Sequence, residues 1–389
     1  MDNDRELKDT MKKILFITGT RADYGKIKSL LKTVEEDPNF ELYIFVSGMH
    51  LVEKLGNTYR EVLKDKYTNV YVDFSQANSG IMSFDLGNVI SNLTNYVKKI
   101  QPDMIVVHGD RIDAMAGAVV GALNNIIVAH IEGGELSGTI DESIRHAVTK
   151  LSHIHLVSNE DAKVRLMQLG EEEQRIFVTG SPDIDIMLSD SLPSIDNAKE
   201  RYEIRFDKYG ICMYHPVTTE VDLLKDHISN LVSALIASER NYVIVYPNND
   251  LGSDIIITEY KRFEGNNHFR VFPSLRFEYF LSLLKNADFM IGNSSAGIRE
   301  TGVYAVPSID LGTRQRGRYS ERNRNLQHTE EQTDKILTAI SKINDYRLTS
   351  YQFGKGNSTE MFMKIIRDEK VWNMSIQKVF VDIKRDINV

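Results

Sequence analysis

The segment HIEGGELSGTIDESIRH, at residues 130–146, concentrates groups that can transfer protons. It holds four carboxylates, two histidines and one arginine, and it follows a run of apolar residues. Glu132 stands at the end of a predicted strand, and the two glycines after it let a ligand approach the backbone closely. We therefore expect Glu132 to act in proton transfer or in stabilising positive charge.

The other acids of this segment have structural explanations that compete with a role in chemistry. Thr139 and Glu142 match a capping box, so Glu142 is expected to cap a helix that begins near Ile140. Asp141 fits either a site residue or an acid that compensates the helix dipole. Arg145, four residues later, lies on the same helix face as Asp141. Glu135 remains open between the two interpretations.

Two earlier segments add charged groups directly after predicted strands. In VHGDRIDAMAG (107–117), Asp110 is either the N-cap of the next helix or a functional acid. In ITGTRADYGKIK (17–28), Arg21 and Lys26 form either a cation pair on a helix face or a clamp for phosphate or carboxylate. This segment matches neither the GxGxxG fingerprint nor the Walker loop.

The second half of the chain carries an anion-binding pattern, IGNSSAGIRE, at residues 291–300. Ser294 and Ser295 lie at a strand end and helix start, where hydroxyls and free N–H groups bind phosphate. Glu300 can accept hydrogen bonds from ribose hydroxyls. The alternative is plain serine capping beside a buried Glu–Arg pair.

Further candidates in this half are LGTRQRGR (311–318) and His215. The arginines, Arg314 among them, either reach phosphate or form a solvated basic loop, and His215 before Pro216 is often only structural in such a position. No CxxC, HExxH or clustered His/Asp pattern with metal spacing is present, so we expect no metal and no cofactor.

Short β-branched runs that alternate with amphipathic segments must position these residues. The runs are apolar on both faces, which is typical of strands buried in a parallel sheet. The predicted strands of the first half are 13–19, 41–48, 69–74, 103–109, 126–133, 154–159 and 176–181, with helices such as 24–37 and 111–125 between them. The alternation predicts a doubly wound α/β sheet.

The pattern then begins again after a polar stretch at residues 189–200. Its predicted strands are 209–217, 241–250, 269–274, 288–295 and 306–312. We predict two tandem Rossmann-like domains, 1–188 and 189–370, and a helix at 371–387 within a final segment, 371–389, that packs back on the first. Ligands bind at the carboxyl ends of strands in such sheets, so the active site is expected in the cleft between the domains.

Composition excludes several classes of protein. A length of 389 residues suggests two domains, and a single cysteine, Cys212, excludes an internal disulfide framework and fits a reducing compartment. The net charge of −8, without a Lys/Arg cluster, argues against a nucleic-acid partner. No apolar run approaches the ~18–20 residues of a membrane span, and the first residues are too charged for a signal peptide. We expect a soluble cytoplasmic protein.

Seven ordered motifs resemble a known family. GTRADYGK, HGDR, HIEGGE, SGTIDESIRH, YHPVTTE, GNSSAGIRE and LGTRQ.GR, spread from about residue 12 to 380, are similar to the hydrolysing UDP-N-acetylglucosamine 2-epimerases of bacterial sialic-acid and legionaminic-acid synthesis. The resemblance implies the GT-B fold. Non-hydrolysing relatives carry GTRPE and PEE..R where this chain has GTRAD and IDESIR, which favours the hydrolysing branch.

The resemblance also implies a role for individual residues. Asp110, Glu132 and Asp141 match the catalytic acids, His215 the active-site histidine, Arg145 the partner on the Asp141 helix, and Lys26 an active-site lysine. The residues that match nucleotide and phosphate contacts are Arg21, Ser294, Ser295, Glu300 and Arg314, with Asn248 and Val271 near the uridine.

The implied reaction eliminates UDP across carbons 1 and 2 to give 2-acetamidoglucal, which water converts to N-acetylmannosamine. We expect Asp110 and Glu132 to act around carbon 2, Asp141 on water or the second proton, and His215 on the leaving diphosphate. Family members form homodimers or homotetramers. Three alternatives stay open: the same reaction on UDP- or GDP-linked N,N'-diacetylbacillosamine, a GT-B glycosyltransferase, and a nucleotide-sugar sensor without turnover.

Overall fold

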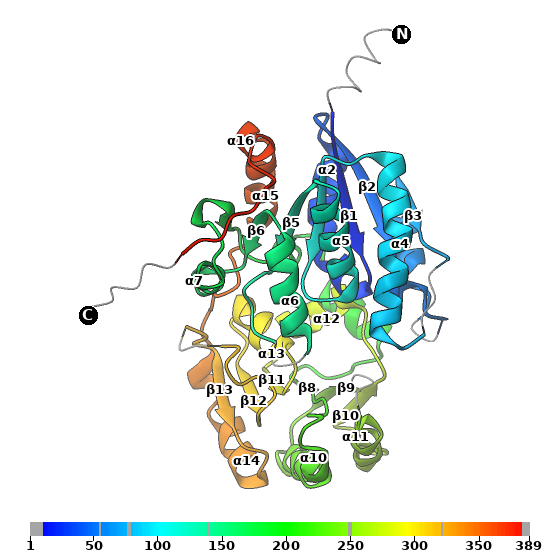
Figure 1. Cartoon of the computed structure of the whole chain (residues 1–389). Helices are drawn as coiled ribbons and strands as arrows, with labels where there is room; N and C mark the ends of the chain where they lie inside the picture. The colour runs from blue at the N-terminus through cyan, green and yellow to red at the C-terminus, as the bar shows by residue number, and fades with distance from the viewer. Residues whose placement is uncertain are drawn as a thin grey trace, which may run out of the picture. The chain divides into compact units, whose positions relative to one another are not determined.

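The chain folds into two compact units, each built on a parallel sheet (Figure 1). The computed structural model describes residues 11–53, 56–75, 79–137, 140–247, 251–319 and 322–382. Unit 1 comprises the chain up to Ile186 and again from Phe353 onward, and unit 2 comprises Met187–Gln352. The chain therefore returns to unit 1 well before residue 371, where we predicted the return.

The sheet of unit 1 has the strand order β3-β2-β1-β4-β5-β6-β7. Its strands are β1 (Lys12–Thr18), β2 (Phe40–Val46), β3 (Val70–Val72), β4 (Met104–His108), β5 (Ile127–Ile131), β6 (Ile154–Val157) and β7 (Ile176–Val178). Its helices are α2 (Arg21–Glu36), α3 (Tyr59–Lys64), α4 (Met82–Ile100), α5 (Ile112–Leu123), α6 (Ile140–Leu151), α7 (Glu160–Gln168), α8 (Pro182–Met187), α15 (Ser358–Ile366) and α16 (Glu369–Trp372).

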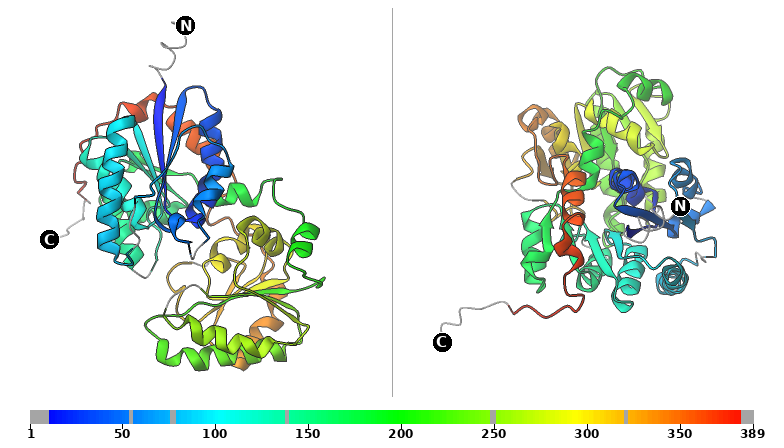
Figure 2. Two further views of the ribbon diagram at one scale, coloured as in Figure 1. Left: turned by 90° about the vertical axis from the view of Figure 1, so that its right-hand side faces the viewer. Right: turned by 90° about the horizontal axis from the view of Figure 1, so that it is seen from above.

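Helices cover both faces of this sheet, as the doubly wound pattern predicts (Figure 2). Because side chains alternate along a strand, Ile14 and Phe16 pack with α2 and α15, whereas Leu15 and Ile17 pack with α4 and α5. Burial on both faces explains why the strands read as continuous apolar runs.

Unit 2 repeats this architecture with the strand order β10-β9-β8-β11-β12-β13. Its strands are β8 (Gly210–Met213), β9 (Tyr242–Val245), β10 (Phe269–Phe272), β11 (Phe289–Gly292), β12 (Ser308–Leu311) and β13 (Leu326–Thr329). Its helices are α9 (Ile195–Arg201), α10 (Val221–Ala237), α11 (Ser253–Tyr260), α12 (Phe277–Lys285), α13 (Ala296–Arg299) and α14 (Thr333–Ser341). Short 3-10 turns lie at Gly48–Leu51, Glu173–Arg175, Lys261–Phe263, Thr301–Tyr304 and Ile343–Tyr346.

The predicted helix at 371–387 is wrong over residues 373–382. α16 ends at Trp372, and the chain continues without helix. Polar groups of unit 1 hold this tail: Arg175 donates to the Ser375 carbonyl (2.9 Å), and the Lys378 ammonium lies 2.6 Å from a Glu171 oxygen. These bonds hold the segment in a non-helical conformation against unit 1. Within the described residues, no helix is long and apolar enough to cross a membrane.

Candidate active site

Two acids meet at the carboxyl edge of the unit 1 sheet because β4 and β5 are parallel neighbours. Asp110 follows β4 and Glu132 follows β5, and the strands pair His108 with Ile131. Glu132 is buried and adopts a left-handed backbone with φ 64°. Such strain costs about 1–3 kcal/mol and persists where the surroundings fix it, typically at functional sites. The conformation supports the functional interpretation of Glu132.

A buried arginine from α6 ties both acids together. The Arg145 guanidinium forms an ion pair with the Asp110 carboxylate. It also donates to the Ser137 hydroxyl (3.0 Å) and, through its other terminal nitrogen, to the Glu132 backbone carbonyl (2.5 Å). Arg145 therefore fixes one acid through its side chain and the other through its backbone. Asp141 lies half-buried in the first turn of the same helix.

Asp110 is held as a carboxylate. Burial favours its neutral form, but the Arg145 charge and the Ser137 hydrogen bond outweigh burial and lower the pKa of Asp110 below its ordinary value. The N-cap position of α5 belongs to Arg111, so the interpretation of Asp110 as the N-cap is wrong. An ionised acid at this edge can accept a proton at neutral pH.

Glu132 has its own cation, supplied by α2. The Lys26 ammonium lies 3.3 Å from Glu132 Oε2 and 3.5 Å from Asp183 Oδ2. The Ser181 hydroxyl donates to Glu132 Oε1, and His108 Nε2 lies 3.3 Å from Oε2. The sequence indicated Lys26 and Glu132 as separate candidates. Sequence reasoning alone assigns no role to Ser181, Asp183 or His108. For Ser181 and Asp183, the polar segment GSPDID directly after a strand is a usable signal.

The remaining candidates of unit 1 are held in local contacts. Arg21 Nε lies 3.1 Å from a Glu61 oxygen, in an ion pair on the surface. Glu142 accepts from the Ser137 backbone N–H (3.1 Å). The predicted capping box stays a prediction, because Thr139 lies outside the described residues. Glu135 accepts from the Ser158 hydroxyl.

In unit 2, a buried asparagine fixes the backbone of His215 after β8. Asn293 accepts from the His215 N–H (2.7 Å) and donates to its carbonyl (2.8 Å). Burial, with a smaller effect of the Arg314 charge, lowers the pKa of His215 to about 3. The imidazole is therefore neutral at physiological pH.

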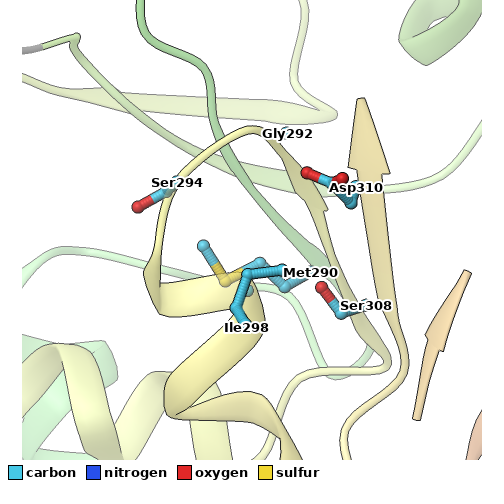
Figure 3. A pocket seen from close by; sticks show the side chains of 7 residues that line it. Met290, Gly292, Ser294, Ile298, Ser308 and Asp310 are labelled. Carbon is cyan, nitrogen blue, oxygen red and sulfur yellow. The ribbon is translucent and has the colours of Figure 1, made fainter. Parts of the chain in front are cut away.

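The turn after β11 lies beside His215 and lines a small pocket. Gly292 has φ 139°, and a Cβ there would meet the Met213 backbone, so only glycine fits. Ser294 and Asp310 line the pocket, with Asp310 on β12 beside the turn (Figure 3). Arg314 donates to the Asn293 carbonyl (3.1 Å), which brings a cation to the same turn.

The other predicted nucleotide contacts are distributed around this turn. Ser295 is the N-cap of α13, and Glu300 is buried at its C-cap. Val271 lies on β10 and packs against the core of unit 2, whereas Asn248 lies outside the described residues. The described residues contain no group of three or more His, Cys, Asp or Glu placed to hold a metal ion.

Unit 1 supplies acids paired with Arg145 and Lys26. Unit 2 supplies hydroxyls, an arginine and a neutral imidazole. A sequence profile of the family described as UDP-N-acetylglucosamine 2-epimerase matches residues 32–367. The chain belongs to this epimerase family.

Curated relatives of the epimerase match over nearly their whole length. UDP-N-acetylglucosamine 2-epimerase from Neisseria meningitidis serogroup B is 47% identical over 380 residues, which cover 96% of this chain and 100% of the relative. UDP-N,N'-diacetylbacillosamine 2-epimerase (hydrolyzing) from Legionella pneumophila is 33% identical over 364 residues, covering 92% and 96%. These identities agree with membership of the epimerase family, and the two relatives are named for different substrates.

Solved structures confirm the fold class of the epimerase. The Neisseria meningitidis UDP-GlcNAc 2-epimerase bound to UDP-GlcNAc has a TM-score of 0.77 at 16% identity, covering 91% of this chain and 99% of that one. The Methanocaldococcus jannaschii enzyme in complex with UDP-GlcNAc and UDP has a TM-score of 0.76 at 22% identity, with the same coverage. The prediction of two tandem Rossmann-like domains of the GT-B type is confirmed.

Proposed function

We propose that this epimerase is of the hydrolysing type and converts UDP-N-acetylglucosamine and water to N-acetylmannosamine and UDP, the first step of sialic-acid synthesis. The observation that carries the proposal is the link from Arg145 to both acids, which holds an ionised Asp110 beside Glu132 at one sheet edge. A relative named as hydrolysing supports it, as do the motifs GTRAD and IDESIR.

Removal of the proton from carbon 2 requires a positioned base and a stabilised transition state. The C–H bond at carbon 2 is weakly acidic because no carbonyl is adjacent, so its proton leaves only as the diphosphate departs from carbon 1. Asp110, kept ionised by Arg145, is the group prepared to accept this proton. Glu132 faces the same carbon and stabilises the oxocarbenium character of the transition state, and Asp141 directs water or returns a proton.

The leaving diphosphate requires donors and positive charge. In the proposal Ser294, Ser295 and Arg314 bind its oxygens, and His215, being neutral, donates a hydrogen bond to it. Glu300 accepts from the ribose, and Arg21, Asn248 and Val271 complete the nucleotide contacts. We further propose a cytoplasmic homodimer or homotetramer without a metal or cofactor.

The test is the reaction in heavy water with UDP-N-acetylglucosamine as the only substrate. We expect UDP and N-acetylmannosamine in equal amounts, with one deuterium at carbon 2 of the sugar. A non-hydrolysing epimerase would instead release the epimerised sugar still attached to UDP. A glycosyltransferase acting on water would leave N-acetylglucosamine with its original hydrogen. Either result in the mass spectrum would reject the proposal.

A second substrate has specific support, because the Legionella relative is named for UDP-N,N'-diacetylbacillosamine. The reaction type would be the same. Assaying both sugar nucleotides side by side separates the two, and a kcat/KM at least tenfold higher for the bacillosamine derivative would replace the first substrate with the second.

A further inference from the structure

The chain leaves unit 1 through residues 179–186, the exit segment. Two buried side chains of this segment contact Glu132 and its cation Lys26. The Ser181 hydroxyl donates to Glu132 Oε1. The Lys26 ammonium lies 3.5 Å from Asp183 Oδ2 and 3.3 Å from Glu132 Oε2. Ser181 and Asp183 are both fully buried. One lysine thus contacts both an acid of the proposed active site and an acid of this exit segment.

The contact with Lys26 supplies a positive charge beside the buried Asp183 carboxylate. A buried carboxylate is costly unless a counter-charge lies beside it. Asp185, two residues later, differs because it caps α15: its oxygens accept from the N–H groups of Ser358 (2.9 Å) and Thr359 (2.6 Å). Of the two aspartates of α8, Asp183 therefore contacts Lys26 near Glu132, whereas Asp185 stabilises the start of α15.

The returning chain locks the exit segment in place. The Ser181 N–H donates to the Phe353 carbonyl (2.7 Å), and the Ser358 hydroxyl donates to the Gly180 carbonyl (3.2 Å). Gly180 and Gly354 both have positive φ, and a Cβ on Gly354 would lie 3.1 Å from the Gly180 Cα. The exit segment and the returning segment are therefore hydrogen-bonded to each other, which restricts the position of the Ser181 side chain.

We propose that Ser181 and Asp183 are positioning residues that fix the Glu132 carboxylate and the Lys26 ammonium, and that they set the protonation of this pair. The inference rests on the proposed function for its catalytic consequence. Among the contacts of the described residues, Glu132 meets Lys26 from α2, His108 from β4 and, at its backbone carbonyl, Arg145 from α6. Lys26 in turn also meets Asp183 from α8.

The first experiment needs no turnover. Competitive labelling of the intact protein with acetic anhydride, read by peptide mass spectrometry, measures the reactivity of Lys26 against pH. An adjacent opposite charge shifts a pKa by roughly 1–3 units, so Asp183→Asn should lower the pKa of Lys26. At a fixed pH below that pKa, more of the amine is then unprotonated, and labelling of Lys26 should rise about tenfold. Asp185→Asn is the matched control, expected to lower the unfolding temperature without changing Lys26 labelling. Equal Lys26 labelling in all three proteins overturns the proposal, whether or not the enzyme is active.

The second experiment reads the catalytic consequence. Ser181→Ala removes a hydrogen bond to the ionised Glu132, so protonation becomes easier and the acid limb of the kcat profile should move to higher pH. We expect kcat to fall severalfold below neutral pH, with KM changed less than twofold. A uniform loss of kcat at every pH, with no shift of the limb, would reduce Ser181 to a structural residue. Failure of wild-type protein to release a deuterated sugar would instead reject the proposed function and leave the labelling result standing.

Discussion

Replacing Arg145 with methionine should cost both stability and turnover, because one side chain serves two acids. Only 5% of the Arg145 side chain and 20% of the Asp110 side chain are exposed, so the pair is largely shielded from water. Breaking a buried pair by removing one partner costs about 3–5 kcal/mol. The residual exposure of Asp110 favours the lower end, about 3 kcal/mol. For a domain of this size that corresponds to a fall of about 6–12 °C in the unfolding temperature.

The loss should depend on pH in a defined direction. The folded-state pKa of Asp110 is depressed, so its contribution to stability is complete above the unfolded pKa of about 4 and disappears as the pH falls through the folded value. The difference in unfolding free energy between wild type and Arg145→Met should therefore be larger at neutral pH than in acid, and it should shrink as the pH falls and the unpaired Asp110 of the variant becomes protonated. Chemical denaturation across this range measures it.

A matched control separates the ion pair from general loss of packing. Arg165 lies near the same edge and donates to the Gly134 carbonyl (3.0 Å). Arg165→Met should lower stability by an amount that does not change as Asp110 titrates, and should retain most of its kcat. Arg145→Met should lose at least about 100-fold in kcat at pH 7, as expected for a misplaced general base. A stability difference for Arg145→Met that is independent of pH, or a near-normal kcat, would refute the assignment.

Three further outcomes are expected. Asp110→Asn and Glu132→Gln should fold, as judged by circular dichroism, yet lose turnover by at least about 100-fold; near-full activity of either would mark a structural residue. Ser295→Ala should chiefly raise KM, because it removes binding shared by substrate and transition state, and a collapse of kcat at unchanged KM would contradict this in steady-state kinetics. The His215 ring should show no protonation above pH 5 in an NMR titration of the free enzyme, since burial lowers its pKa to about 3; a midpoint near 6.5 would show that the ring is solvated.

Most strands were predictable from sequence because both faces of each sheet are buried. β1 and β4 lie inside the sheet and read as unbroken apolar runs. β13 was missed, since the edge strand Leu326–Thr329 is mostly polar and carries an exposed His328. The tail after Trp372 has a helical pattern of apolar residues, yet it is not helical. Its apolar residues Val379 and Phe380 remain exposed, and its Ser375 carbonyl accepts a hydrogen bond from the Arg175 side chain.

The candidate site was predictable residue by residue but not as an arrangement. The position of Asp110 at a strand end predicts either function or capping, and the N-cap position of Arg111 excludes capping, while the Arg145 contact supports function. Helical spacing associated Arg145 with Asp141, whereas the guanidinium reaches Asp110 and the Glu132 carbonyl, which are distant in sequence. Asp183 cannot be assigned to the site from sequence, because its contact Lys26 comes from α2, which is distant in the chain.

The separate cations of the two acids bear on how the proposed reaction uses them. If one cation bridged both carboxylates, their titrations would be coupled and neither could change charge independently. Here the Arg145 guanidinium contacts the Asp110 carboxylate but only the backbone carbonyl of Glu132, while Lys26 contacts the Glu132 carboxylate. The two carboxylates therefore contact different cations. In the proposed elimination and hydration, a proton is taken from carbon 2 in the first step and delivered to it in the second, so two acids held by different cations can serve the two steps.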